Sequence, residues 1–152
     1  MRLSLATRRW LARLTAPQRR KPAGKKRHAP AALKAPRLRL LGARGKLRIY
    51  LVDATAVRKM TDRNPNAPDF TMGTNDAVWR NVTGPNEVWI ADELGPLERK
   101  LTMLHELLER RRMKRDGLSY DDAHDEALAA ENRYRQANGR GLAAALRKER
   151  GQ

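Results

Sequence analysis

The sequence predicts an α+β fold: a small mixed or antiparallel sheet packed on two long antiparallel helices and preceded by a disordered basic N-terminal arm. Three observations support this prediction. Residues 46–53 and 87–91 alternate in the manner of strands and are rich in β-branched and aromatic residues. Residues 96–115 and 120–136 carry apolar side chains at helical spacing. The first 45 residues contain no acidic side chain, and prolines and basic residues cluster within them.

Charge divides the 152-residue chain unevenly. Sixteen Lys and Arg precede Asp53, the first acidic residue, whereas the remaining seventeen basic residues equal the seventeen acidic ones. The net charge of +16 therefore belongs to the first third of the chain. We divide the chain into a basic, largely disordered extension (1–45), an α+β domain (46–138) and a frayed C-terminal tail (139–152), in which we expect a short, frayed helix over residues 142–150. The sequence has no cysteine, which excludes disulfides and thiolate zinc sites, and no apolar run long enough to cross a membrane.

The basic arm has three interpretations. It can bind nucleic-acid phosphates without reading sequence, in a cytoplasmic or virion-associated protein, because counterion release drives such binding. Its amphipathic, arginine-rich start, residues 1–16, is also typical of a mitochondrial presequence. The third interpretation is a solvated extension, which a start codon assigned too far upstream can also produce. The first interpretation places the phosphate contacts on a basic cluster of six residues: Arg19, Arg20, Lys21, Lys25, Lys26 and Arg27.

The domain begins with a strand over 46–53, in which Leu47 and Ile49 alternate with polar neighbours. A short helix over 54–61 follows, with Asp53 as its N-cap. Two prolines and two asparagines then predict a loop.

Three further strands are expected before the long helices. The first ends at Gly73, and the second covers Val78 and Trp79. The third, over 87–91, places Val88 on one face and Trp89 on the other.

Sequence signals at their ends delimit the two long helices. Pro96 suits the first position of the helix 96–115, and Asp116-Gly117 ends it. Ser119 caps the helix 120–136, with an acidic residue three positions later as in a capping box.

The first long helix is apolar on two opposite sides, which is typical of a helix buried between two layers. Between these sides runs a polar strip: Thr102, His105, Glu106 and Glu109. On the second helix, His124 and Glu131 fall on the apolar, inward face. Because unpaired buried charge is expensive, these polar groups need a partner or a ligand.

A zinc site is one explanation. His105 and Glu109 lie one helical turn apart and can bind the same ion, and His124 on the facing helix can supply the third ligand. Glu106 points about 100° away from His105, so it can act as general base on water. Glu131 can orient His124 or replace Glu109 as a ligand. The alternatives are a hydrogen-bonded polar cluster that holds the two helices together, and unrelated surface positions.

The motif His105-Glu106-x-x-Glu109 resembles the zincin metallopeptidase motif HExxH, with Glu in place of the second His. The strand 87–91 is similar to the zincin edge strand that pairs with an extended substrate. The segments NEVWIAD, LHELLERRRM and LSYDDAH-x-x-A-x-x-x-E resemble small uncharacterised phage and bacterial zincin-like proteins, over residues 46–135. The resemblance implies that His105 is a metal ligand and Glu106 the general base, and it places Glu109 at the second ligand position.

Two functions follow from these patterns. The first is a zinc-dependent, peptidase-like hydrolase that acts on a protein or peptide. The second is a non-catalytic protein, associated with nucleic acid or part of a phage structure, that keeps the zincin-like scaffold. The acid-free arm and the HExxE departure from the motif favour the second.

Overall fold

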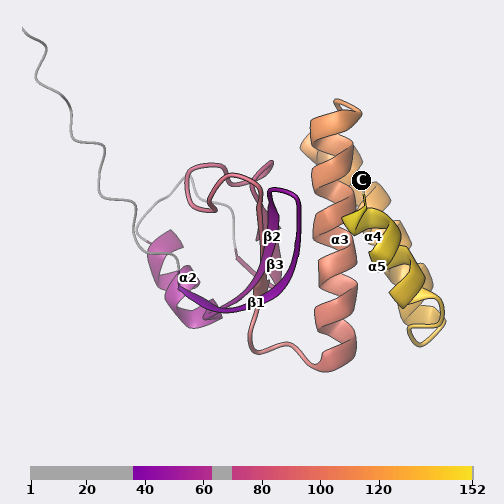
Figure 1. The fold of residues 1–152 in the computed structure, drawn as a ribbon, viewed down its shortest axis with the longest axis horizontal. Helices are drawn as coiled ribbons and strands as arrows, with labels where there is room; N and C mark the ends of the chain where they lie inside the picture. The colour runs from indigo at the N-terminus through magenta and orange to yellow at the C-terminus, as the bar shows by residue number, and fades with distance from the viewer. Residues whose placement is uncertain (1–35, 63–69, 152) are drawn as a thin grey trace, which may run out of the picture. The chain divides into compact units, whose positions relative to one another are not determined.

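The structure is a computed structural model, which describes residues 36–62 and 70–151. A four-stranded mixed sheet and four helices make up this part of the chain, so the α+β class is confirmed. Figure 1 shows the sheet between α2 (Ala54–Thr61) on one side and α3 (Pro96–Arg115), α4 (Tyr120–Gln136) and α5 (Leu142–Arg150) on the other. Among the described helices, none combines the length and the apolar character that crossing a membrane requires.

The sheet has the strand order β1-β2-β4-β3. Its strands are β1 (Arg37–Arg44), β2 (Leu47–Val52), β3 (Gly73–Asn75) and β4 (Glu87–Ala91). The pair β2–β4 is parallel, and the pairs β1–β2 and β3–β4 are antiparallel.

The strand β1 corrects the expected boundary of the basic arm. It lies within the segment 1–45 that was assigned to the extension from the sequence, and it forms a hairpin with β2. Arg37 at its start makes an ion pair with Glu87 of β4, with 2.7 Å between nitrogen and oxygen. The strand is hard to recognise because three of its eight residues are arginines and because Leu38 and Leu40 are half exposed.

The strand β4 lies inside the sheet, between β2 and β3. This position contradicts the expectation that residues 87–91 form an edge strand, because both of their backbone edges are already paired. The edge beside the long helices belongs to β3, which starts at Gly73 instead of ending there. The strand expected at Val78 and Trp79 is wrong, since these residues lie in a turn region after β3.

Both faces of the strand β4 are buried, and its side chains alternate between them as expected for residues 87–91. Val88 and Ile90 join a core with the apolar side chains of α3 and α5. Trp89 joins a second core on the opposite face, together with Val57 of α2 and Trp79. The helix α3 therefore packs on the covered centre of the sheet.

The long helices have the bounds that their end signals predict. Pro96 is the first residue of α3, and the Ser119 hydroxyl accepts a hydrogen bond from the Asp122 amide at the start of α4. Asp53 likewise caps α2 through the amide of Ala56.

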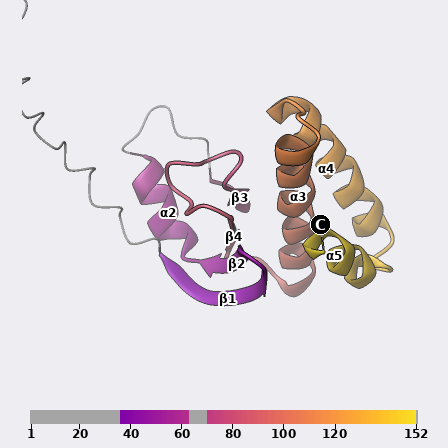
Figure 2. The same cartoon turned by 45° about the horizontal axis from the view of Figure 1, so that its top comes forward.

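The helix α5 has the bounds of the short helix expected within the C-terminal tail, residues 142–150, but it is packed on the core and not frayed. Leu142 and Leu146 are 2% and 6% exposed, and both belong to the core on the α3 side of the sheet. Each leucine buried in this way stabilises the fold by about 1.5–3 kcal/mol. Figure 2, which turns the view by 45°, shows α5 beside α3 and α4.

Candidate metal centre

The polar strip of α3 is buried, as its position between two apolar sides predicts. Thr102, His105, Glu106 and Glu109 are between 2% and 7% exposed. Three titratable groups on one helix, all removed from water, would be destabilising without partners. Their partners come from α4 and from β3.

Three of the predicted ligands converge on one point. Nε2 of His105 lies 3.1 Å from Nδ1 of His124, and Nδ1 of His124 lies 2.9 Å from Oε2 of Glu109. The remaining side of the triangle, from His105 Nε2 to Glu109 Oε2, is 3.5 Å. This group of ligand atoms could hold a metal ion.

The other nitrogen of His105 is held from α4. Nδ1 of His105 lies 2.8 Å from Oε2 of Glu131. The other carboxylate oxygen of Glu131, Oε1, accepts a hydrogen bond of 2.5 Å from Arg135. Arg135 also makes an ion pair of 2.7 Å with Glu98 of α3. Glu131 therefore orients His105, whereas the sequence-based expectation was that it would orient His124. With Nδ1 engaged by a carboxylate, the Nε2 atom of His105 faces the ligand triangle.

Charge in this cluster favours a proton on His105. Burial by itself lowers the pKa of His105, but hydrogen bonds to Glu109 and Glu131 more than offset this effect and raise the pKa to about 10. Hydrogen bonds from the histidines likewise hold the pKa of Glu109 below its usual range, against the effect of burial. Because a metal ligand histidine must be neutral at the binding nitrogen, an ion that binds here has to displace a proton.

Glu106 points away from the ligand triangle and toward β3. Its Oε2 accepts a hydrogen bond of 2.9 Å from Nδ2 of Asn75. The same Asn75 nitrogen donates to Oε1 of Glu109 at 2.8 Å, so one fully buried amide links both carboxylates. Burial, followed by the charge of Glu109, raises the pKa of Glu106 to about 8.

Gly73 brings the sheet edge close to Glu106. A Cβ atom at this position would lie 2.8 Å from Cγ2 of Thr102 and 2.9 Å from Oε1 of Glu106. Any larger residue at Gly73 would therefore push on both side chains. The absence of a side chain allows β3 to approach α3 closely enough for Asn75 to contact the carboxylates.

An ion-pair cluster fastens the far end of β3 to α3. Asp76, which is 5% exposed, accepts from Nε of Arg110 at 2.6 Å and from Lys114. Its carboxylate also accepts from the backbone amide of Asn86 at 2.8 Å. Burial favours a higher pKa for Asp76, but the hydrogen bonds from Lys114 and Arg110 outweigh it and lower the pKa.

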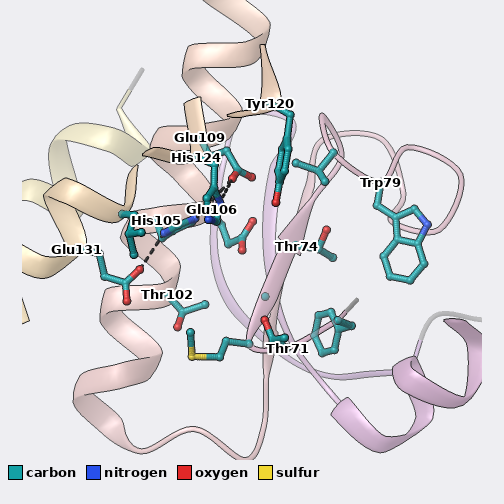
Figure 3. A pocket seen from close by; sticks show the side chains of 15 residues that line it. Thr71, Thr74, Trp79, Thr102, His105, Glu106, Glu109, Tyr120, His124 and Glu131 are labelled. Atoms are coloured by element: carbon teal, nitrogen blue, oxygen red, sulfur yellow. Dashed lines mark hydrogen bonds and ion pairs between the residues drawn. The ribbon is translucent and has the colours of Figure 1, made fainter. Parts of the chain in front are cut away.

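The site opens into a cavity of about 270 Å³ between β3 and the helices. Its polar side is formed by the carboxylates and histidines of α3 and α4, and its other walls are largely apolar or aromatic: Phe70, Met72, Val78, Trp79, Tyr120 and Leu128. Figure 3 shows Tyr120 above this space and Glu106 directed into it. Tyr120 also packs against His124, with ring centroids 5.4 Å apart. A ligand in the cavity would meet a negative group at one side and apolar surfaces at the other.

The donor set, two imidazole nitrogens and one carboxylate oxygen, could hold a metal ion. Zinc–nitrogen and zinc–oxygen bonds of about 2.0–2.2 Å place the ligand atoms of a tetrahedral site about 3.3–3.6 Å apart. Of the separations observed here, 3.5 Å lies in this range, whereas 2.9 and 3.1 Å are shorter, so His124 would have to move outward by a few tenths of an ångström to share an ion. Two histidines and one carboxylate also match a ligand set of catalytic zinc, which leaves a fourth position for water.

The structure brings together the five residues that were selected from the sequence on α3 and α4: His105, Glu106, Glu109, His124 and Glu131. Two contributors were missed, Asn75 and Gly73, and both lie on the three-residue strand β3. The six basic residues selected between Arg19 and Arg27 lie outside the described residues.

A scan against models of protein families, a search of curated proteins and a search of solved structures each gave no significant match.

Proposed function

We propose that this chain is a zinc-dependent, peptidase-like hydrolase. The observation that carries the proposal is the convergence of His105 Nε2, Glu109 Oε2 and His124 Nδ1 on one point beside a cavity. In this proposal the HExxE segment works as a zincin-like motif, and α3 and α4 form an antiparallel pair that holds the ligands.

Glu106 is the general base in this proposal. It lines the cavity, and Asn75 fixes one of its oxygens while the carboxylate remains directed toward the cavity. A bound zinc ion would supply a Lewis acid that activates water near neutral pH and polarises a carbonyl group. The positive charge of a bound ion would lower the raised pKa of Glu106 and favour its carboxylate form. That carboxylate would take a proton from the attacking water and deliver it to the leaving amine, so the proton is returned and only water is consumed. The apolar walls of the cavity would hold a substrate side chain.

Metal binding is tested on the full chain. Elemental analysis is expected to show one zinc ion per chain. Zinc titration against a chromophoric chelator is expected to show that the affinity for zinc falls at least tenfold in Glu109→Ala and in His124→Ala. Glu126→Ala is the matched control, because Glu126 is an exposed glutamate of α4 whose ion pair with Arg112 lies outside the ligand triangle. Zinc at 100 times its Kd is expected to stabilise the wild type by about 2.7 kcal/mol.

Catalysis is tested separately with Glu106→Gln, which keeps the size of the side chain. We expect this variant to bind zinc and to lose hydrolysis of an unstructured protein substrate such as casein. Absence of stoichiometric metal, together with a His105→Ala variant that keeps every property of the wild type, would refute the metal centre.

The second candidate function is a non-catalytic nucleic-acid-associated or phage structural protein. The acid-free first 52 residues, with their sixteen Lys and Arg, favour it. It predicts salt-sensitive binding to DNA or RNA that falls when Arg19, Arg20 and Lys21 are changed to Gln. In that function Glu106→Gln changes nothing measurable.

A further inference from the structure

Three elements of the folded part, β1, β2 and α5, carry positive charge that almost no acidic residue of the same elements balances. Residues 37–52 carry five Lys and Arg and no acidic residue, and α5 carries three with a single Glu. Between Asp53 and Gly141, by contrast, sixteen acidic residues outnumber fourteen basic ones. The folded part therefore has a strongly basic end that is separate from the negative site on α3.

The turn of the β1–β2 hairpin and the last turn of α5 lie against each other. Cζ of Arg150 is 3.5 Å from the position that a Cβ atom on Gly42 would occupy. Cζ of Arg44 is 3.2 Å from the corresponding position on Gly151. These contacts bring together a surface, called the basic face below, that consists of Arg44, Lys46, Arg147, Lys148 and Arg150.

The basic face has little neutralising charge. Four of its members are exposed and make no ion pair with any described residue: Arg44, Lys46, Arg147 and Lys148. Glu149, the one carboxylate on these three elements, is already held by Arg111 at 2.8 Å. The preceding arm contains no acidic residue either, so it cannot neutralise the face.

We infer that the basic face binds the phosphate backbone of nucleic acid without reading its sequence. A small anion is a poor fit, because the last turn of a helix presents backbone carbonyl groups and not amide donors. A long polyanion is a better fit, since flexible, exposed Lys and Arg side chains can each contact a different phosphate. This inference is independent of the proposed hydrolase function.

The test compares two triple variants in the full chain. The face variant is Arg44→Gln, Lys46→Gln and Lys148→Gln. The control variant is Lys59→Gln, Arg80→Gln and Lys100→Gln, which also removes one arginine and two lysines from exposed positions elsewhere. Binding of a fluorescent 20-base-pair DNA duplex is measured by anisotropy from 50 to 300 mM KCl, and circular dichroism checks folding. If the face variant unfolds, a double variant with Lys46→Gln and Lys148→Gln replaces it.

Each phosphate contact contributes about 0.9 to the slope of log K against log salt. We expect the face variant to reduce this slope by about 2–3 and the control to reduce it by less than 1. The slope is expected to fall by the same amount for two duplexes of unrelated sequence. Equal slopes for face and control variants would overturn the inference and leave any binding to the arm. A second result would also overturn the inference: the face variant keeps its binding to the duplex but loses binding to vesicles of phosphatidylserine and phosphatidylcholine. That result would indicate that the basic face binds a membrane surface.

Discussion

The close approach of β3 to α3 at Gly73 gives a prediction whose size can be worked out from distances. In Gly73→Ala the new methyl group would lie 2.8 Å from Cγ2 of Thr102. An unstrained carbon–carbon contact is about 3.5 Å or longer, so one side has to move by about 0.7 Å. Thr102 is a β-branched residue inside a helix and is 3% exposed, which leaves it little freedom to rotate.

The expected free-energy change follows from two opposing terms. Overpacking of a buried contact costs about 1–3 kcal/mol. Replacing glycine by alanine in a compatible backbone conformation returns about 0.4–1 kcal/mol by restricting the unfolded chain. We therefore expect Gly73→Ala to lower the free energy of unfolding by about 1–2 kcal/mol. Urea titration followed by tryptophan fluorescence measures this quantity.

Two controls separate this clash from a general glycine effect. Gly95→Ala serves as the first, because nothing lies within 4 Å of a Cβ atom at Gly95. Its expected change is below about 0.5 kcal/mol. In the second control, Thr102→Ser removes the methyl group that the new side chain would meet, so Gly73→Ala should cost at least about 0.5 kcal/mol less in that background. A Gly73→Ala protein as stable as the wild type, or a double variant without coupling, would refute the reasoning.

Three further predictions concern neighbouring elements. Asn75→Ala removes the donor shared by two buried carboxylates, so we expect it to lower the free energy of unfolding, measured in urea, by about 1–3 kcal/mol. Asn75→Asp should lower it at least as much. If neither variant changed the free energy of unfolding, the hydrogen bonds from Asn75 to Glu106 and Glu109 would be contradicted. Asp76 has a lowered pKa in the fold, so its stabilising contribution is complete above its unfolded pKa of about 3.9 and is lost as the pH falls through the folded value. The wild type should therefore lose more stability than Asp76→Asn between pH 5.5 and 3, and parallel pH profiles would argue against the pairing with Arg110 and Lys114. Ser119→Ala should destabilise α4 by about 1 kcal/mol, measured by thermal unfolding, whereas Ser119→Asp should retain most of the stability as an alternative cap.

The long helices were predictable from the sequence because their signals are local. Pro96, Ser119 and the apolar periodicity all act within one helix, and no distant contact is needed to interpret them. The same locality made most of the candidate site visible. His105 and Glu109 lie one turn apart, and His124 follows after a short connection.

The parts that escaped prediction depend on contacts between distant segments. The strand β3 has three residues, too few to show any periodicity, and its position is set by pairing with β4 and by the contact of Gly73 with α3. For the same reason, the role of Asn75 becomes visible only when β3 is placed beside Glu106. The strand β1 was hidden by a different effect, because its arginines extend the basic composition of the preceding arm.

The spacing of the site residues along the chain has a consequence for the order of folding. His105 and His124 are 19 residues apart, whereas Asn75 and Glu109 are 34 apart and require the sheet to be in place. Contacts close in sequence form with the smaller entropic cost and generally form early. If the proposed zinc site is correct, we expect the ion to bind the partly folded α3–α4 pair and to increase the refolding rate in stopped-flow experiments. The opposite result, in which zinc changes only the unfolding rate, would mean that the ligand cluster assembles after the rate-limiting step. In the expected case, the ion would serve in folding as a nucleus around which the sheet docks, before it takes part in any chemistry.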